Sequence, residues 1–78
     1  MEIRITLHAK ERMKKYGLIE LQVKNCVNNP DIVVEGKSNR KIAQKRINGY
    51  VLRVIYEKHD NVYVVITTYK AKRERYEI

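Results

Sequence analysis

The segment TLHAKERMKKYG, from Thr6 to Gly17, combines a titratable imidazole with fixed positive charges. At helical spacing, His8, Arg12 and Lys15 fall on one stripe, at intervals of four and three residues. An apolar stripe lies beside it, formed by Ala9, Met13 and Tyr16. Histidine exchanges a proton near neutral pH, and arginine holds an anion through two hydrogen bonds. The stripe therefore predicts a site that binds a phosphate group and transfers a proton next to it.

The charge of the chain favours a polyanionic partner. Lys and Arg number 17 against 9 Asp and Glu, a net charge of +8, which indicates nucleic acid first and an acidic protein or anionic membrane surface second. The alternative is a solvated basic surface that serves solubility. The cations assigned to nucleic-acid binding are Lys15, Lys41, Lys45, Arg46, Lys72 and Arg73.

Length and cysteine content restrict the class of protein. The 78 residues predict one domain, 1–78, with room for a single small core. Neither a membrane-length apolar stretch nor a signal-peptide core is present, so a cytoplasmic protein without a membrane partner is expected. The single cysteine, Cys26, is predicted to be a small core residue. No metal-ligand spacing or phosphate loop occurs, so neither a metal nor a cofactor is expected.

The hydrophobic periodicity predicts two helices followed by four strands. Thr6 is a good N-cap and Gly17 a good end for the first helix, and Asn29 and Pro30 end the second. The expected helices are 7–16 and 19–28, and the expected strands are 31–35, 40–47, 50–58 and 62–69. This order predicts an α+β fold of two layers, in which two N-terminal helices pack on a four-stranded antiparallel meander.

The strongest turn signal is Asn48-Gly49, which is typical of a type I′ hairpin. A two-residue loop places Ile47 opposite Tyr50 and Gln44 opposite Arg53. Arg53 interrupts an apolar strand, and a buried unpaired charge is costly. It must therefore bind an anion, pair with another group, or extend to solvent.

The second hairpin, which turns around His59, Asp60 and Asn61, has an ambiguous register. One register puts Thr68 on the face of Arg53, and a slip of one residue puts Thr67 and Tyr69 there instead. We expect His59 itself to have a surface role.

Several segments, taken in order, resemble a known superfamily. They are HAKERMKKYGL, NNPD, LRVIY, VITTY and KAKRERYE, spanning Thr6 to Glu77. They are similar to the RelE-like branch of the barnase–EndoU–colicin–RelE superfamily. Within it, they resemble BrnT-type toxins and an uncharacterised family with a His-Ala-x-x-Arg-Met helix and a Val-Ile-Thr-x-Tyr strand. The resemblance implies a metal-independent endoribonuclease, an mRNA interferase of a toxin–antitoxin pair, acting on RNA that could be ribosome-bound. An acidic or DNA-binding antitoxin would be its partner.

Such cleavage uses the 2′-hydroxyl of RNA as nucleophile and needs a proton acceptor, a cation and a proton donor. His8 is the candidate acid or base, Arg12 would hold the phosphate, and Arg53 would stabilise the developing charge. Thr67 would bond a phosphate oxygen, and Tyr69 would stack on a base or donate a proton.

Other interpretations remain open at this level. His8 could be a structural imidazole and Tyr69 a packing residue, and no second catalytic His or Glu is visible. The main alternative is a non-catalytic RNA- or protein-binding module of the same fold. A weaker one is a structural or phage-related accessory protein.

Overall fold

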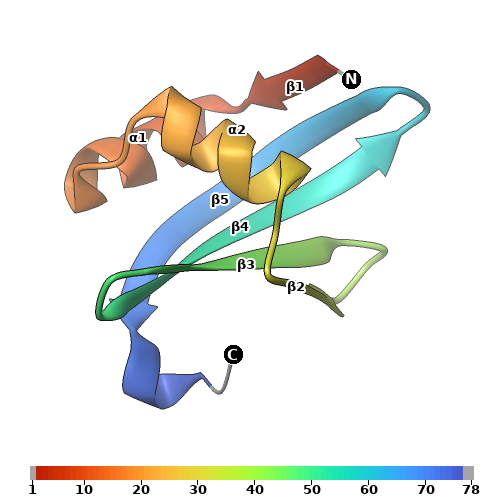
Figure 1. The fold of residues 1–78 in the computed structure, drawn as a ribbon. Coiled ribbons are helices and arrows are strands. Elements are labelled where there is room, and N and C mark those ends of the chain that lie inside the picture. Colours follow the sequence, from red (N-terminus) through yellow and green to blue (C-terminus); the bar gives the residue numbers. More distant parts are fainter. Residues whose placement is uncertain (1, 77–78) are drawn as a thin grey trace.

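Two helices lie together on one side of a five-stranded sheet (Figure 1). The computed structural model describes residues 2–76; Met1, Ile78 and Glu77, where the resemblance ends, lie outside the described residues. The elements are β1 (Glu2–Ile5), α1 (Leu7–Tyr16), α2 (Glu20–Asn28), β2 (Ile32–Glu35), β3 (Lys41–Ile47), β4 (Tyr50–His59), β5 (Val62–Lys72) and the 3₁₀ turn η1 (Arg73–Arg75). The predicted two-layer α+β class is confirmed.

The ends of α1 follow from its capping residues. The hydroxyl of Thr6 accepts a hydrogen bond from the Ala9 N–H at 3.2 Å, which satisfies one of the free donors of the first turn. At the other end Gly17 adopts a left-handed φ of 66°, which glycine tolerates without steric cost. Both predicted ends of this helix are therefore confirmed.

The predicted sheet lacked one strand. β1 pairs in parallel with Val62–Val65 of β5, so the strand order is β1-β5-β4-β3-β2 and the sheet is mixed rather than an antiparallel meander. Alternation in EIRI turns Ile3 and Ile5 towards the core, and both are half-buried. So short an alternation is a weak local signal. Its pairing partner lies about sixty residues away in the chain.

The first hairpin has the predicted register. Ile47 is paired with Tyr50, and Gln44 with Arg53. The turn conformation differs from the prediction, because Asn48 has a φ of 54° while Gly49 is not in the left-handed region. A type I′ turn requires positive φ at both positions.

A β-bulge in the second hairpin decides which side chains share the face of Arg53. His59 pairs with Val62 across a two-residue loop, and Tyr56 with Val65, but Ile55 pairs with Thr67. Ile66 is thus the extra residue in β5, and the register shifts by one beyond it. Tyr69 consequently lies opposite Arg53, which settles the ambiguity in favour of Thr67 and Tyr69.

The core fills the space between the helices and the sheet. Its fully buried side chains are Ala9, Val23, Cys26, Ala43, Leu52, Val54 and Val65. Cys26 is the core residue that was predicted, and burial raises the pKa of its thiol to about 12, so it stays protonated.

The opposite side of the sheet is called the open face. Alternation along the strands places on it Gln44, Arg53, Ile55, Thr67 and Tyr69. Within residues 2–76 no helix of the α type covers this side (Figure 1).

Candidate functional site

Arg53 is the centre of a polar cluster on the open face. Its Nη1 donates hydrogen bonds to the hydroxyl of Tyr69 at 2.5 Å and to that of Tyr76 at 3.1 Å. Its guanidinium carbon also lies 5.6 Å from the ring centre of Tyr69 and 4.5 Å from that of Tyr76. Both distances are within the range of cation–π attraction. The guanidinium is therefore held between two aromatic rings with its charge partly exposed.

The two tyrosines differ in acidity. Burial raises the pKa of Tyr69, and the hydrogen bond that its hydroxyl makes with Tyr76 adds to the increase. The same hydrogen bond lowers the pKa of Tyr76, and the charge of Arg53 lowers it further. At neutral pH Tyr69 is therefore a protonated hydroxyl that can donate a hydrogen bond or a proton.

Two buried polar atoms beside this cluster are unsatisfied. In residues 2–76, the Oε1 of Gln44 and the Nε of Arg53 are the buried side-chain atoms without a hydrogen-bond partner. Gln44 is only 4% exposed, and its strand position is opposite Arg53. An unpaired buried donor or acceptor costs about 1–3 kcal/mol. Both atoms are enclosed by protein, so a ligand on the open face does not reach them as the side chains stand.

His8 and Arg12 form a second group on α1. His8 is exposed and Arg12 is half-buried. Arg12 donates from Nη2 to the hydroxyl of Tyr16 at 3.1 Å, and its guanidinium lies 5.2 Å from that ring. Lys15 also lies over Tyr16, at 5.8 Å. Two of the three members of the predicted stripe, Arg12 and Lys15, therefore lie against the ring of Tyr16.

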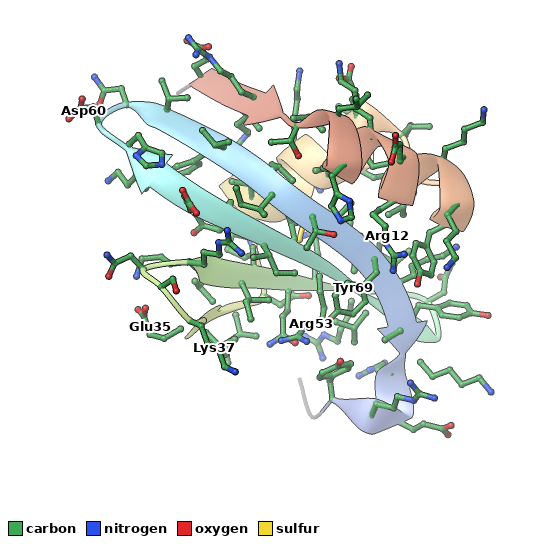
Figure 2. All side chains as sticks on the ribbon, turned by 180° about the vertical axis from the view of Figure 1, so that it is seen from behind. Arg12, Glu35, Lys37, Arg53, Asp60 and Tyr69 are labelled. Carbon is green, nitrogen blue, oxygen red and sulfur yellow. The ribbon has the colours of Figure 1, made fainter. Side chains whose placement is uncertain are left out.

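β5 is the border between the two groups. α1 packs against β5, and β1 pairs with that strand only as far as Val65. The strand edge beyond this point is free of a neighbouring strand among the described residues. Figure 2 shows Arg12, Tyr69 and Arg53 in succession from α1 across β5 to β4. Hydrogen bonds join Arg53 to Tyr69; across residues 2–76, none joins Arg12 to Tyr69.

Thr67 lies on the open face opposite Ile55 and is half-buried. Its neighbour Thr68 points to the other side of the sheet, where it is fully buried and its hydroxyl donates to the carbonyl oxygen of Arg53 at 2.8 Å. Of the two threonines, Thr67 is the one that a ligand on the open face can reach.

The six cations assigned to nucleic-acid binding are in different environments. Lys41 pairs with Glu35 at 2.7 Å, Lys45 donates to the carbonyl oxygen of Asn29 at 2.7 Å, and Arg46 lies 3.7 Å from Asp31. Lys15 is exposed on α1, Lys72 is exposed at the end of β5, and Arg73 is exposed at the start of η1. The charges with the greatest freedom to meet a polyanion are therefore on α1 and at the C-terminal end of β5.

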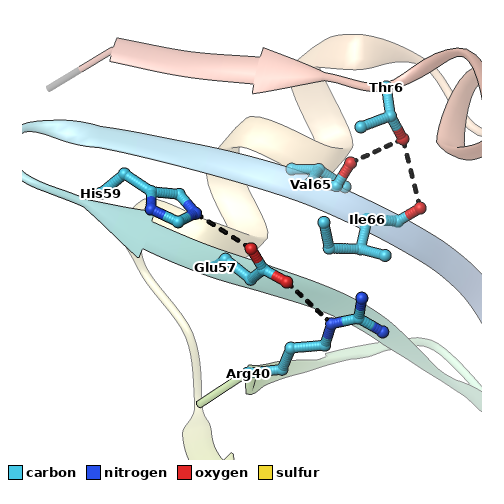
Figure 3. Close-up of polar contacts among 6 residues, drawn as sticks. All are labelled: Thr6, Arg40, Glu57, His59, Val65 and Ile66. Carbon is cyan, nitrogen blue, oxygen red and sulfur yellow. Dashed lines mark hydrogen bonds and ion pairs between the residues drawn. The ribbon is translucent and has the colours of Figure 1, made fainter. Parts of the chain in front are cut away.

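An ionic triad that sequence reasoning missed lies further along β4. Glu57 accepts hydrogen bonds from Arg40 Nε at 2.9 Å and contacts His59 Nε2 at 2.9 Å (Figure 3). These contacts lower the pKa of Glu57, with the Arg40 hydrogen bond as the largest cause. The Glu57 carboxylate is therefore occupied by Arg40 and His59. The predicted surface position of His59 is confirmed by its exposure.

Tyr76 was also missed as a site residue. Tyr76 belongs to the basic segment RERYE, and no local pattern shows that this segment returns to the sheet. The return is fixed by a backbone hydrogen bond from Arg73 N to the Gly49 carbonyl oxygen at 3.0 Å. A tyrosine four positions beyond the last basic strand residue is too weak a signal to identify this contact.

Neither a metal-binding cluster nor a membrane-spanning helix occurs in residues 2–76. Residues 2–76 hold no group of three or more His, Cys, Asp or Glu side chains suited to a metal ion. Among the same residues, each helix is too short and too polar to cross a bilayer.

Comparison with known proteins gives a family and a fold. A family model described as a domain of unknown function (DUF4258) matches residues 5–70. No curated protein sequence matches the chain. Among solved structures, the chain is similar to the 1.1 Å crystal structure of the Brucella abortus ribonuclease toxin BrnT. The TM-score is 0.65 at 20% identity, and the match covers 92% of this chain and 97% of the other. The predicted RelE-like, BrnT-like fold is thus confirmed.

Proposed function

Because this chain belongs to the DUF4258 family and has the fold of a ribonuclease toxin, we propose that it is a small metal-independent endoribonuclease of the toxin type. RNA is its substrate, and cleavage proceeds by attack of the 2′-hydroxyl on the adjacent phosphorus. The observation that carries this proposal is the cluster at Arg53: a half-buried guanidinium between two tyrosines, without a carboxylate partner in residues 2–76.

The cluster suits a phosphate in its charge and its donors. An oxygen of the scissile phosphate would accept hydrogen bonds from the accessible part of the half-buried Arg53 guanidinium. Charge develops on this group as the phosphorane forms, and a fixed cation in a partly buried position stabilises that charge best. The hydroxyls of Thr67 and Tyr69 would bond further oxygens, and either tyrosine ring can stack on a base.

The proton transfers are assigned to α1 and β5. His8 would accept the proton of the 2′-hydroxyl, and Arg12 would hold the neighbouring phosphate from the same helix face. Tyr69, which burial keeps protonated, would donate to the leaving 5′-oxygen. RNA would therefore cross the edge of β5 between α1 and the open face.

A cleavage assay tests the proposal. Wild-type protein should cut RNA in EDTA and leave 2′,3′-cyclic phosphate ends. Cleavage of ribosome-bound RNA is assayed separately, in a buffer that contains Mg²⁺. We expect His8→Ala to lower the rate by about 100-fold or more, the usual contribution of a general acid or base, and Arg12→Ala and Arg53→Ala to do so as well. His59→Ala is the matched control, since it removes an exposed histidine outside the cluster, and it should cut normally.

The outcomes distinguish an error in the assignment of catalytic residues from an error in the proposed activity. Normal cleavage by both His8→Ala and Arg12→Ala would refute the assignment of α1 to catalysis. Salt-dependent RNA binding without any cleavage would support the alternative, a non-catalytic RNA-binding module of the same fold. The basic surface also fits an acidic antitoxin, and we propose that such a partner would cover Arg53 and compete with RNA.

A further inference from the structure

The C-terminal segment, residues 73–76, is attached to β4 at two points. The chain leaves β5 and turns through η1 (Figure 1), and the hydrogen bond from Arg73 N to the Gly49 carbonyl oxygen, at 3.0 Å, fixes the start of this turn. At the other end, Tyr76 accepts a hydrogen bond from Arg53 at 3.1 Å and lies with its ring against the guanidinium. Residues 73–76 are called the strap.

The burial of nearby side chains shows that the open face is covered where the strap lies. Val51 is between the two attachment points in β4, and alternation places it on the open face with Arg53. It is fully buried although it is not part of the core between helices and sheet. Gln44 is buried on the same face, whereas Ile42 and Ile55, further along the sheet, are only half-buried. The strap therefore covers the part of the open face that carries Arg53.

Few contacts keep the strap in place. Arg73, Glu74 and Arg75 are exposed, so the strap packs on the sheet through Tyr76. The Tyr76 hydroxyl is a neutral partner for Arg53, and a hydrogen bond between two charged groups is stronger. The closed arrangement also leaves Arg53 Nε and Gln44 Oε1 enclosed without partners, which is unfavourable. A negatively charged partner for Arg53 can therefore replace Tyr76.

From these contacts we propose that the strap closes the Arg53 site in the free protein, and that a phosphate group opens it by replacing Tyr76 on the guanidinium. The bond from Arg73 N to Gly49 O is the fixed point, and residues 74–76 swing away from the sheet. Arg53 Nε then becomes accessible and donates to a phosphate oxygen. The inference rests on the proposed function in that Arg53 binds the phosphate of RNA, but the strap can be tested without RNA.

The test is a titration of the full chain with inorganic phosphate at constant ionic strength. NMR follows the Nε–H signal of Arg53 and the ring signals of Tyr76. Phosphate should shift both along one saturation curve, because binding at Arg53 and release of Tyr76 are the same event. Hydrogen exchange of the Arg73 amide should be unchanged, since its bond to Gly49 is kept.

Tyr76→Ala removes the side chain that closes the site. If only the open state binds, the apparent Kd is the intrinsic Kd divided by the open fraction. A strap that is closed about two-thirds of the time or more thus predicts phosphate binding about threefold tighter or more in Tyr76→Ala. Tyr76→Phe, which keeps the ring but not the hydroxyl, should give a smaller increase. Tyr50→Ala is the matched control: it removes an exposed tyrosine at the same end of the sheet and should bind phosphate like the wild type.

Three results would overturn the inference. They are weaker or unchanged phosphate binding by Tyr76→Ala, a response at Arg53 that leaves the Tyr76 ring signals in place, and a titration without any response at Arg53. RNA cleavage by the same samples is measured separately. A wild type that cuts RNA but fails these tests would refute the strap alone. If Tyr76→Ala binds phosphate more tightly while neither it nor the wild type cuts RNA, the proposed function alone is refuted.

Discussion

At the scale of single residues, Arg53 shows how one charge in an apolar strand is accommodated. The sequence left three environments open for it: a bound anion, a paired group, or solvent. The structure gives it two tyrosine hydroxyls and two aromatic faces but no carboxylate hydrogen bond or ion pair in residues 2–76. Since neutral partners leave the positive charge uncompensated, the cluster retains affinity for an anion.

The ionic triad gives a pH prediction at the same scale. The folded state lowers the pKa of Glu57 from 4.5, so its contribution to stability is present above the unfolded pKa and is lost as pH falls through the folded one. Glu57→Gln should lower the free energy of unfolding at pH 7, and the difference from wild type should shrink towards pH 3. Urea denaturation at several pH values measures it.

A matched control for this prediction is Glu11→Gln, which removes a carboxylate exposed on α1. We expect its difference from wild type to be small at every pH. A Glu57→Gln difference that stayed constant from pH 7 to pH 3 would contradict the assignment of the effect to the Arg40–Glu57–His59 contacts.

At the scale of elements, the bulge at Ile66 does most to assemble the candidate site. Without it, the loop register would place Thr68 opposite Arg53 and turn Tyr69 towards the helices. The bulge lies where Thr6 meets β5: the Thr6 hydroxyl donates to the carbonyl oxygen of Val65 at 2.8 Å and lies 3.2 Å from that of Ile66 (Figure 3). The same hydroxyl caps α1. One side chain thus fixes the start of the helix that carries His8 and the bulge that orients Tyr69.

Thr6→Val tests this positioning role, because valine has nearly the same shape but no hydroxyl. We expect it to lower the free energy of unfolding by about 1–2 kcal/mol through the lost cap and the lost hydroxyl bond to Val65, whose carbonyl group keeps the Thr6 N–H as a partner. It should also shift the NMR signals of the Tyr69 ring and speed hydrogen exchange of the Thr67 amide. Thr6→Ser, which keeps the hydroxyl, should leave the Tyr69 ring signals and the exchange rate of the Thr67 amide as in the wild type.

A stability loss in Thr6→Val with unchanged Tyr69 and Thr67 signals would mean that Thr6 only caps α1. The bulge would then be maintained by β5 itself.

At the scale of the whole molecule, the side chains that give the net charge of +8 differ in how readily they can bind RNA. Lys41 and Lys45 are engaged by Glu35 and by the Asn29 carbonyl group, whereas Lys72 and Arg73 are exposed at one end of the sheet. A single-stranded RNA should therefore gain most of its electrostatic binding from the second pair.

The salt dependence of RNA binding measures this difference. Each neutralised phosphate contributes a slope of about 0.7 in log K against log salt on a single strand. Replacing Lys72 and Arg73 together by Ala should lower the slope by about 1.4. Replacing Lys41 and Lys45 together removes the same formal charge and should change the slope less. An equal decrease of the slope in the two double variants would show that RNA binding depends only on the net charge of the protein.

Local sequence patterns by themselves determined most helix ends and the first hairpin of this protein. The caps at Thr6 and Gly17, the helix that ends before Asn29, and the hairpin at Asn48-Gly49 depend on neighbours within a few residues, and all were predictable. So was the pairing of Gln44 with Arg53, because a two-residue loop fixes the register of both strands. The order of the predicted helices and strands supplied the fold class, and the resemblance of ordered motifs supplied the proposed chemistry.

Tertiary structure alone decided the rest, since it depends on contacts between distant segments. β1 exists because it pairs with a strand about sixty residues away, and Tyr76 meets Arg53 because the C-terminal segment folds back over the sheet. The bulge at Ile66 is held in part by Thr6, from the other end of the chain. A one-residue difference in register is invisible in a run of β-branched residues, yet it determines whether Thr68 or the pair Thr67 and Tyr69 shares the face of Arg53.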